Sequence, residues 1–353
     1  MKLQQPGGPQ ALTLSEVPIP VPEADEALVR VAACGFCHHD LLVMRGLLRR
    51  GVKPGLIPGH EISGTVTQVG GNVTTLTPGD RVVSLLVSAC GHCDRCLEGR
   101  QHRCRNGLGI GHGRDGGFAE YVTASEFGLV KLPDDADLLS AAMFACPMGV
   151  ALQGLRQSAQ VQPGETVVVT GAGGGLGTHS VQLASALGCR VLAVTSSPEK
   201  TEALTALGAA DVLQTSGSHS DDLDFSEIVL ALTEDQGAQV VIDTVGSAVY
   251  PSTWLSLAQF GRWVLLGEIA GNPVRIDPAE VIFRDARILG SSGVSRDGVL
   301  QVAGMVSQGL VKAVVGRTLA MEEASTAYGL MADRIIVGRI LLIPPGSSIP
   351  VPD

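Results

Sequence analysis

Residues 167–177 read VVVTGAGGGLG and join an apolar run to a helical pattern in the middle of the chain. An apolar run over 166–170 leads into the glycines, and residues 178–187 continue at helical spacing. Glycines let the backbone approach a pyrophosphate, and the helix N-terminus that follows supplies N–H groups and a favourable dipole. The spacing of Gly171, Gly174 and Gly177 is a variant of the G-x-G-x-x-G pattern. Its position between a strand and a helix predicts a dinucleotide-binding turn rather than a merely structural one.

Further strands and helices alternate on the C-terminal side of this turn. We expect strands at 190–195, 211–214, 239–244 and 262–266, and helices at 198–207, 226–232 and 251–258. Strands that are apolar throughout and alternate with helices indicate a parallel sheet covered on both faces. The predicted fold class is therefore α/β, with a doubly wound parallel sheet of the Rossmann type.

The rest of the chain has a different sequence pattern. The first ~150 residues contain β-branched runs at 27–33, 64–69 and 80–86, bounded by Gly, Pro and Asp, and few long helical patterns. Residues 310–344 return to a strand, a helix at 321–331 and a last strand at 338–343. This end is too short to form a domain, so we expect it to pack onto the first region. The Pro- and Ser-rich tail 344–353 is expected to fray.

Length and composition exclude several classes of protein. The 353 residues are 45% apolar, which suffices for a large core and suggests two domains. The net charge of −10 and the lack of a basic run argue against a nucleic-acid partner. No stretch approaches the ~20 apolar residues that span a bilayer, and the start is not a signal peptide. We therefore expect a cytoplasmic protein with no membrane partner, in which clustered cysteines bind metal rather than form disulfides.

Four cysteines stand in a C-x2-C-x2-C-x7-C pattern: Cys90, Cys93, Cys96 and Cys104. A tight turn can bring thiolates at this spacing onto one tetrahedral zinc ion. Iron–sulfur clusters also use four cysteines, but the charged residues Arg95, Glu98 and Arg100 favour a zinc loop. Four thiolates leave no open coordination position, so this metal is predicted to be structural.

A second set of candidate ligands is scattered along the chain. It consists of Cys37, His60 and Cys146, each of which alone would be an ordinary core residue. Together they offer two sulfurs and an imidazole, and a zinc ion with three protein ligands keeps one position for water or substrate. Such an ion polarises a carbonyl and stabilises an alkoxide. Spacing alone does not show that the three residues meet.

The end of the second predicted strand indicates the cofactor. An acidic residue there would bind the ribose hydroxyls of NAD. This chain has Thr195, Ser196 and Ser197, followed by Lys200. Hydroxyls and a lysine can hold a 2′-phosphate, so NADP(H) is favoured over NAD(H), although Glu199 lies nearby and no arginine is present.

Taken together, these residues resemble the zinc-dependent medium-chain alcohol dehydrogenase family over nearly the whole chain. The markers are CHHD at 37–40, GHE at 59–61, the four-cysteine lobe, Cys146, the glycine turn, VIDTVG at 241–246 and VGR at 337–339. The resemblance implies a mainly β, GroES-like catalytic domain from residues 1–149 and 291–353, with the zinc lobe at about 88–106. It also implies a Rossmann dinucleotide-binding domain at 150–290.

The resemblance also implies roles for individual residues. Cys37, His60 and Cys146 hold a catalytic zinc, Glu61 is an acid near that metal, and Asp40 orients a ligand. The four cysteines of the lobe hold the second zinc ion. The cofactor contacts are His38, Gly171, Gly173, Gly174, Gly175, Leu176, Gly177, Thr195, Ser196, Ser197, Lys200, Thr244, Val245, Gly267, Ser291, Ser292, Gly293 and Arg339. The implied chemistry is hydride transfer between a nicotinamide and an alcohol or carbonyl compound.

The sequence departs from the family pattern at three positions. His39 stands where the family usually has the first hydroxyl of its proton relay, Leu42 where some members have a histidine, and Val150 where a threonine often supports the nicotinamide. His39 could itself carry the proton, because its ordinary pKa suits that task. The alternative is a histidine that only shapes the pocket.

The substrate is predicted to be a small apolar alcohol or aldehyde. Aromatic residues are only 3% of the chain, so aliphatic side chains should line the pocket. Candidates by placement are Leu42, Met44, Leu85 and Phe144. The resemblance further implies a homodimer or homotetramer, with residues 289–294 as a candidate edge-strand contact.

Two other functions compete with this one. The chain also resembles acryloyl-CoA reductases, which reduce a conjugated C=C bond, at Cys37 and at residues 40–42, 44–46, 59–61 and 242–246. Arg45, Arg49, Arg50 and Lys53 could favour an anionic CoA ester, although basic loops are usually solvated surface. The other alternative is a catalytically inactive cofactor-binding protein, which the complete set of metal ligands disfavours.

Overall fold

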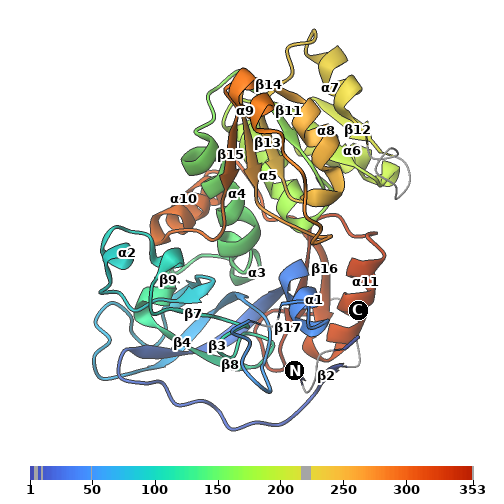
Figure 1. The fold of residues 1–353 in the computed structure, drawn as a ribbon. Helices are drawn as coiled ribbons and strands as arrows, with labels where there is room; N and C mark the ends of the chain where they lie inside the picture. The colour runs from blue at the N-terminus through green and yellow to red at the C-terminus, as the bar shows by residue number, and fades with distance from the viewer. Residues whose placement is uncertain (4–6, 9–10, 49, 216–223, 352–353) are drawn as a thin grey trace. The chain divides into compact units, whose positions relative to one another are not determined.

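The computed structural model describes residues 1–3, 7–8, 11–48, 50–215 and 224–351. The chain divides into two compact units, traced in Figure 1. The first unit joins Met1–Gly149 to Gly293–Asp353, and the second unit is Val150–Ser292. The predicted fraying of the tail concerns residues 344–353, of which 352–353 lie outside the described residues.

The unit Val150–Ser292 is built on a six-stranded sheet with the order β12-β11-β10-β13-β14-β15. Every neighbouring pair in it is parallel, which confirms the doubly wound α/β prediction. The strands are β10 (Thr166–Val169), β11 (Arg190–Thr195), β12 (Asp211–Gln214), β13 (Ala238–Asp243), β14 (Leu257–Leu265) and β15 (Arg287–Gly290). The central strand β10 is fully apolar at Val167, Val168 and Val169 because helices cover both faces of a parallel sheet.

The helices of this unit follow the expected alternation, with shifted ends. They are α4 (Val150–Leu152), α5 (Gly175–Ala186), α6 (Thr201–Ala206), α7 (Ser226–Leu232), α8 (Tyr250–Leu255) and α9 (Pro278–Arg284). The expected helix 198–207 is in fact a 3₁₀ turn over Pro198–Lys200 followed by α6. The expected helix 251–258 was too long, because Leu257 already pairs with Ala238 as the first residue of β14 and is buried in the core.

The other unit is mainly β, as predicted. Its large sheet has the order β16-β17-β3-β4-β5-β9, with β8 also paired to β3. The strands are β3 (Glu26–Phe36), β4 (Glu61–Val69), β5 (Arg81–Ser84), β8 (Tyr121–Ser125), β9 (Leu129–Lys131), β16 (Val315–Ala320) and β17 (Arg339–Ile343). Strand β17 pairs antiparallel with β3, opposing Leu341 to Gly35, so the C-terminal segment does return to the first region.

Short strand pairs and several helices complete this unit. The short strand pairs are β1 (Lys2–Leu3) with β2 (Leu12–Thr13) and β6 (Val87–Ser88) with β7 (Leu108–Gly109). The helices are α1 (His38–Met44), α2 (Asp94–Leu97), α3 (Leu138–Ala141), α10 (Arg296–Ser307) and α11 (Ala324–Ala332). A π-helical turn at Phe144–Gly149 contains Pro147. In the described ranges, no helix is both long and apolar enough to cross a bilayer.

Helix α10 was not expected from the sequence. Its buried side chains Val299, Val302 and Met305 recur every three residues, and Ser295 caps its start by accepting a hydrogen bond from the Gly298 N–H. Gly298 and Gly304 interrupt the helical pattern in the sequence, and glycine is a poor helix former. Packing against the rest of the unit therefore decides this helix.

Candidate functional site

Three distant segments of the first unit bring together a cluster of metal-ligating side chains. One ligand atom from each of Cys37, His60, Glu61 and Cys146 lies within 4.8 Å of every other. Cys37 is the N-cap of α1, immediately after β3, whereas His60 and Glu61 lie at the start of β4. Cys146 belongs to the π-helical turn Phe144–Gly149. The fold thus joins the three scattered residues that spacing alone could not connect.

Asp40 orients this cluster from the first turn of α1. Its carboxylate is fully buried and accepts hydrogen bonds from the backbone N–H of Cys37 (2.8 Å) and of Gly59 (3.3 Å). The Asp40 carboxylate also lies 3.3 Å from Nδ1 of His60. An N–H at Nδ1 directed to this carboxylate leaves the Nε2 lone pair of His60 free to ligate a metal. Asp40 and Cys37 also raise the pKa of His60, against the lowering effect of burial.

Glu61 is buried without a complete set of hydrogen bonds. Neither of its carboxylate oxygens has a hydrogen-bond partner of good geometry among the described residues, although the Arg339 guanidinium forms an ion pair with it at 2.9 Å. Burial raises the pKa of Glu61 to about 7. Gly35 makes room for this carboxylate, because any Cβ there would collide with Oε2 of Glu61. A buried, under-satisfied carboxylate next to thiols and an imidazole fits a site for a cation.

The two thiols of the cluster are electrostatically coupled. A hydrogen bond from Cys146 holds the pKa of Cys37 well below its ordinary value, and the same contact raises the pKa of Cys146. Arg339 adds positive charge 4.0 Å from the Cys146 sulfur. Thiolate is the form that ligates metals, and a bound cation would favour it at both sulfurs.

The four-cysteine lobe forms a second cluster. Ligand atoms of Cys90, Cys93, Cys96 and Cys104 all lie within 4.8 Å of one another, and none of the four forms a disulfide. The sulfurs of Cys93 and Cys104 are 3.9 Å apart, and the backbone N–H of Cys90 points to the Cys104 sulfur at 3.2 Å. Four converging sulfurs with N–H donors around them fit a closed tetrahedral zinc site.

The glycine turn connects β10 to α5 as expected. Helix α5 begins at Gly175 and has Gly174 as its N-cap. A Cβ at Gly177 would collide with the carbonyl oxygen of Gly171, and one at Gly171 would lie 2.6 Å from Oγ1 of Thr244. Gly171 also has φ +58°, which only glycine adopts easily. Gly171 and Gly177 are therefore required for backbone packing at the turn that leads into the N-terminus of α5.

Other predicted cofactor residues of this unit gather at the carboxyl ends of the strands. The Thr244 hydroxyl donates to the carbonyl of Thr170 (2.8 Å), and the space beside Gly267 is closed by the Thr244 carbonyl. Asp243 underlies this edge, accepting hydrogen bonds from the Thr170 hydroxyl and the Val245 and Gly246 N–H groups. In doubly wound sheets, ligands bind at this end of the strands.

The residues at the end of β11 differ in exposure and in hydrogen bonding. The Thr195 hydroxyl accepts a hydrogen bond from the Ser197 N–H, whereas Ser196 is exposed. Lys200 is buried and lies so close to the glycine turn that a Cβ at Gly173 would lie 2.5 Å from its Cδ. The lysine and the turn are therefore neighbours, which the sequence could not show.

The remaining predicted contacts lie at the end of β15 and in the first unit. Ser291 is held by a hydrogen bond from its N–H to the Leu265 carbonyl, and Ser292 is exposed. In the first unit, Gly293 packs against His102 of the cysteine lobe, and His38 has a buried Nε2 with no described partner.

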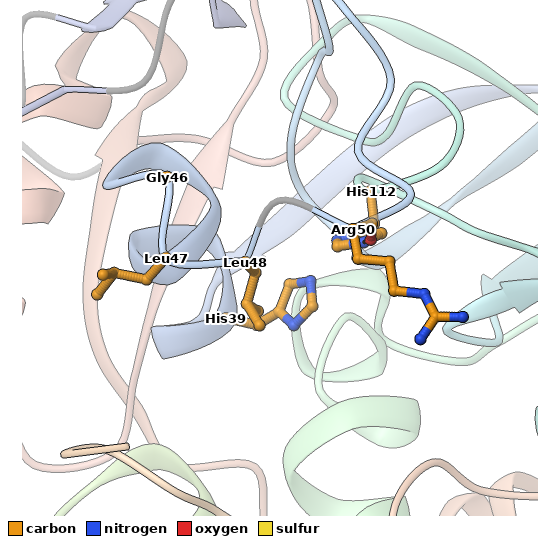
Figure 2. Close-up of a pocket in the computed structure, with 6 residues that line it drawn as sticks. All are labelled: His39, Gly46, Leu47, Leu48, Arg50 and His112. Atoms are coloured by element: carbon orange, nitrogen blue, oxygen red, sulfur yellow. Dashed lines mark hydrogen bonds between the residues drawn. The ribbon is translucent and has the colours of Figure 1, made fainter. Parts of the chain in front are cut away.

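A pocket lies in the first unit, beside the cluster of Cys37, His60, Glu61 and Cys146 (Figure 2). The cavity measures about 630 Å³ and is lined by His39, Gly46, Leu47, Leu48, Arg50 and His112. The His39 ring lies 5.1 Å from the His60 ring and 5.3 Å from the His112 ring, centre to centre. Burial lowers the pKa of His39. His39 therefore connects the metal cluster to the pocket.

The pocket residues expected from the sequence differ from this lining. Met44 and Leu85 are fully buried, Phe144 is 4% exposed, and Leu42 is half-buried. None of them lines the cavity of Figure 2, which is lined instead by His39 of α1, by residues of the loop after α1 and by His112. Their role in binding substrate stays a prediction. The signal for the loop was present as a basic stretch close to His39, but a basic stretch is typical of any solvated surface.

Comparisons with known proteins agree with this architecture. Residues 23–134 match the family described as "Alcohol dehydrogenase GroES-like domain", and residues 175–308 match "Zinc-binding dehydrogenase". The chain is 32% identical to an acryloyl-coenzyme A reductase of Sulfurisphaera tokodaii, covering 96% of this chain and 98% of that one. It is 34% identical to an alcohol dehydrogenase of Geobacillus stearothermophilus, covering 94% and 96%.

A solved structure extends the similarity to three dimensions. It is a cobalt- and zinc-bound thermostable alcohol dehydrogenase from Pyrobaculum aerophilum, with a TM-score of 0.86 and 28% identity over 97% of this chain and 98% of that one. The two family matches and relatives above 30% identity over more than 90% of the chain establish the family. This chain belongs to the zinc-type medium-chain alcohol dehydrogenase family.

Proposed function

We propose that this chain transfers a hydride between a nicotinamide cofactor and a primary or secondary alcohol, or the matching carbonyl compound. The observation that carries the proposal is the convergence of Cys37, His60 and Cys146 beside the buried Glu61. Two sulfurs and an imidazole suit Zn²⁺, and three ligands leave a position for substrate. A zinc ion bound there supplies a Lewis acid that polarises the substrate oxygen.

The chain's own residues prepare this site. Asp40 fixes the His60 ring by its contact with Nδ1 and holds the Cys37 N–H, so two ligands are oriented by one carboxylate. Arg339 balances the charge of Glu61 and of the nearby thiols, which keeps a buried acid from standing alone. His39 lies between His60 and the pocket, where it is placed either to pass a proton or to shape the cavity.

We further propose two zinc ions per chain and NADP(H) as the favoured cofactor. The four-cysteine lobe would hold the structural ion, and the glycine turn would hold the pyrophosphate. Ser196 is exposed and Lys200 lies at the turn, which supports binding of a 2′-phosphate, although Glu199 lies next to Lys200. Installing an acid by Ser196→Asp should shift the ratio of kcat/KM for NADPH over NADH towards NADH. Equal kinetic constants of the wild type for both cofactors would overturn the preference.

A second candidate function is reduction of the C=C bond of an acryloyl-CoA-like thioester. The full-length similarity to acryloyl-coenzyme A reductases favours it, as does the basic loop after α1. Against it stands the complete cluster of Cys37, His60 and Cys146, because a Lewis acid serves a carbonyl or alcohol oxygen better than an alkene. The third candidate, a catalytically inactive protein, is disfavoured because the ligand set is complete and Asp40 still contacts Nδ1 of His60.

The deciding experiment measures NADPH consumption by purified, zinc-loaded protein. Aliphatic and aromatic aldehydes are compared with acryloyl-CoA in the same run. Aldehyde turnover that Cys37→Ser abolishes supports the proposed function. Cys189→Ser is the matched control, because it removes a buried thiol that belongs to neither cluster. Turnover of acryloyl-CoA alone, retained in Cys37→Ser, would overturn the proposal.

We also propose a homodimer or homotetramer. Strand β15 is the last strand of the parallel sheet and pairs on one side only, with β14, among the described residues. Such an edge offers unpaired backbone groups to a second copy. Light scattering of the purified protein tests this, and a monomer at micromolar concentration would contradict it.

A further inference from the structure

The pocket beside His39 contains a cation that no described residue neutralises. Arg50 lies on its wall, together with the aliphatic side chains of Leu47 and Leu48 (Figure 2). The other described cations of this loop are engaged: Arg45 donates to the Tyr328 hydroxyl at 2.8 Å, and Lys53 pairs with Asp115 at 2.5 Å. Within the described ranges, the Arg50 guanidinium forms neither an ion pair nor a hydrogen bond with another side chain.

The backbone that carries Arg50 is nonetheless anchored. The Nε2 of His112 donates to the carbonyl oxygen of Arg50 at 2.9 Å, and the N–H of Lys53 donates to the carbonyl of His112 at 2.8 Å. The Lys53–Asp115 pair closes the same segment, since Asp115 also accepts from the Ile57 N–H. A cation on an anchored backbone loses less freedom on binding a ligand than one on a loose loop.

The chemistry of the lining selects one kind of ligand. Among the residues that the structure describes, no acidic side chain lines the cavity, whereas the chain as a whole carries a net charge of −10. His112 contributes a buried Nδ1 that no described residue satisfies; because Nε2 donates to the Arg50 carbonyl, Nδ1 of the neutral ring is an acceptor and suits a water molecule rather than the anion itself. Leu47 and Leu48 add aliphatic side chains to the lining (Figure 2).

We propose that this pocket binds an anionic group at the far end of the substrate, with Arg50 as its specificity-determining residue. This inference rests on the proposed function, because it assumes that the reacting oxygen lies at the metal cluster. The substrate class is then an aliphatic alcohol or aldehyde, or a thioester, whose tail ends in a carboxylate or a phosphate. Arginine matches both groups because its planar guanidinium donates two parallel hydrogen bonds.

The test compares pairs of substrates in which one member carries an anionic tail and the other a neutral one. Butanal, hexanal and octanal are paired with the semialdehydes of succinate, adipate and suberate, and kcat/KM is measured with zinc-loaded wild type. Acryloyl-CoA is paired with S-acryloyl-N-acetylcysteamine, which lacks the phosphates. The proposal expects the anionic member of at least one pair to be favoured about tenfold, which is ~1.4 kcal/mol. The pair that shows the effect identifies a carboxylate or a phosphate as the recognised group.

Two variants assign the effect to Arg50. Arg50→Gln is expected to reduce the anionic-to-neutral ratio about tenfold. Arg45→Gln removes the same charge five residues away, from a side chain that donates to Tyr328 rather than to the Arg50 segment, and is expected to keep that ratio within twofold. Equal treatment of charged and neutral tails by the wild type overturns the proposal. So does an equal loss in both variants, because a general surface field would then be responsible.

A binding measurement separates this proposal from the proposed function. If no substrate pair is turned over, the proposed hydride transfer fails, but calorimetric titration with adipate monoamide and hexanamide still tests the pocket. About tenfold tighter binding of the monoamide, lost in Arg50→Gln, supports anion recognition. Equal binding of the two amides overturns it.

Discussion

The guanidinium of Arg339 lies 2.9 Å from the carboxylate of Glu61, and both side chains are almost completely buried. One comes from the last strand of the first unit and the other from β4, so the pair crosses 278 positions of sequence. Its two members face the thiols of the candidate metal cluster. The pair therefore belongs to the electrostatics of the site as much as to the packing of the sheet.

Removing Arg339 should destabilise the protein strongly. Arg339→Met leaves Glu61 buried beside two thiols without its cation, and breaking a buried pair in this way costs ~3–5 kcal/mol. Urea denaturation of zinc-loaded protein measures the free energy of unfolding. Adding Glu61→Gln to the same variant should recover part of the loss, since it removes the stranded charge. An Arg339→Met variant as stable as wild type would show that the ion pair does not matter for folding.

The four-cysteine lobe and the cluster of Cys37, His60 and Cys146 should lose metal independently of each other. Cys93→Ser is expected to remove one zinc ion per chain and lower the melting temperature, because a four-thiolate site stabilises its lobe. Cys146→Ser is expected to remove the other ion and abolish turnover. Elemental analysis alongside thermal melting measures both effects. Cys189→Ser should keep both ions, and a metal content unchanged by Cys93→Ser would contradict the structural zinc.

The glycines of the turn should differ sharply from a glycine elsewhere. Gly177→Ala would drive its Cβ into the Gly171 carbonyl and to 2.6 Å from the Ala172 Cα, so stability should fall by ~1–3 kcal/mol and cofactor binding should weaken. Gly304→Ala in α10 meets no atom within 4 Å and should stabilise the protein by ~0.5–1 kcal/mol. Thermal melting and fluorescence titration with NADPH measure the two effects. A Gly177→Ala variant that binds the cofactor normally would refute the close approach.

Asp224 should make stability depend on pH in the acid range. Its carboxylate accepts hydrogen bonds from the Ser226 hydroxyl (2.7 Å), the Ser226 N–H (2.9 Å) and the Ser252 hydroxyl (2.7 Å). The Ser226 hydroxyl is the main cause of its lowered pKa. Because the folded-state pKa lies below the unfolded value of about 3.9, this stabilisation is present above that pH and is lost as pH falls through the folded value.

The corresponding variant is Asp224→Ala. Its melting temperature should be lower than that of wild type near neutral pH, with a cost of about 1 kcal/mol, and the difference should shrink as the pH falls below about 3.9. Glu227→Ala, which removes a nearby carboxylate on α7, should show no such convergence. A difference between Asp224→Ala and wild type that is constant with pH would exclude the carboxylate as its source.

Local sequence pattern determined the parts of this protein that depend on neighbours in the chain. The glycine turn, the parallel strands around it and the four-cysteine lobe were all predictable, because their members lie within a few residues of one another. Helix ends were less certain. The limit of α8 at Leu255 is decided by the pairing of Leu257 with Ala238, which helical spacing does not record.

Contacts between side chains that are distant in the sequence became visible only in the folded unit. The sequence named Cys37, His60 and Cys146, and their family resemblance suggested a shared ion, but the fold brings their ligand atoms within 4.8 Å. The contact of Lys200 with the glycine turn and the pocket formed by His39, Arg50 and His112 likewise depend on how strands and loops pack. Spacing along a chain encodes secondary structure and short loops, whereas long-range contacts follow from burial and pairing over the whole unit.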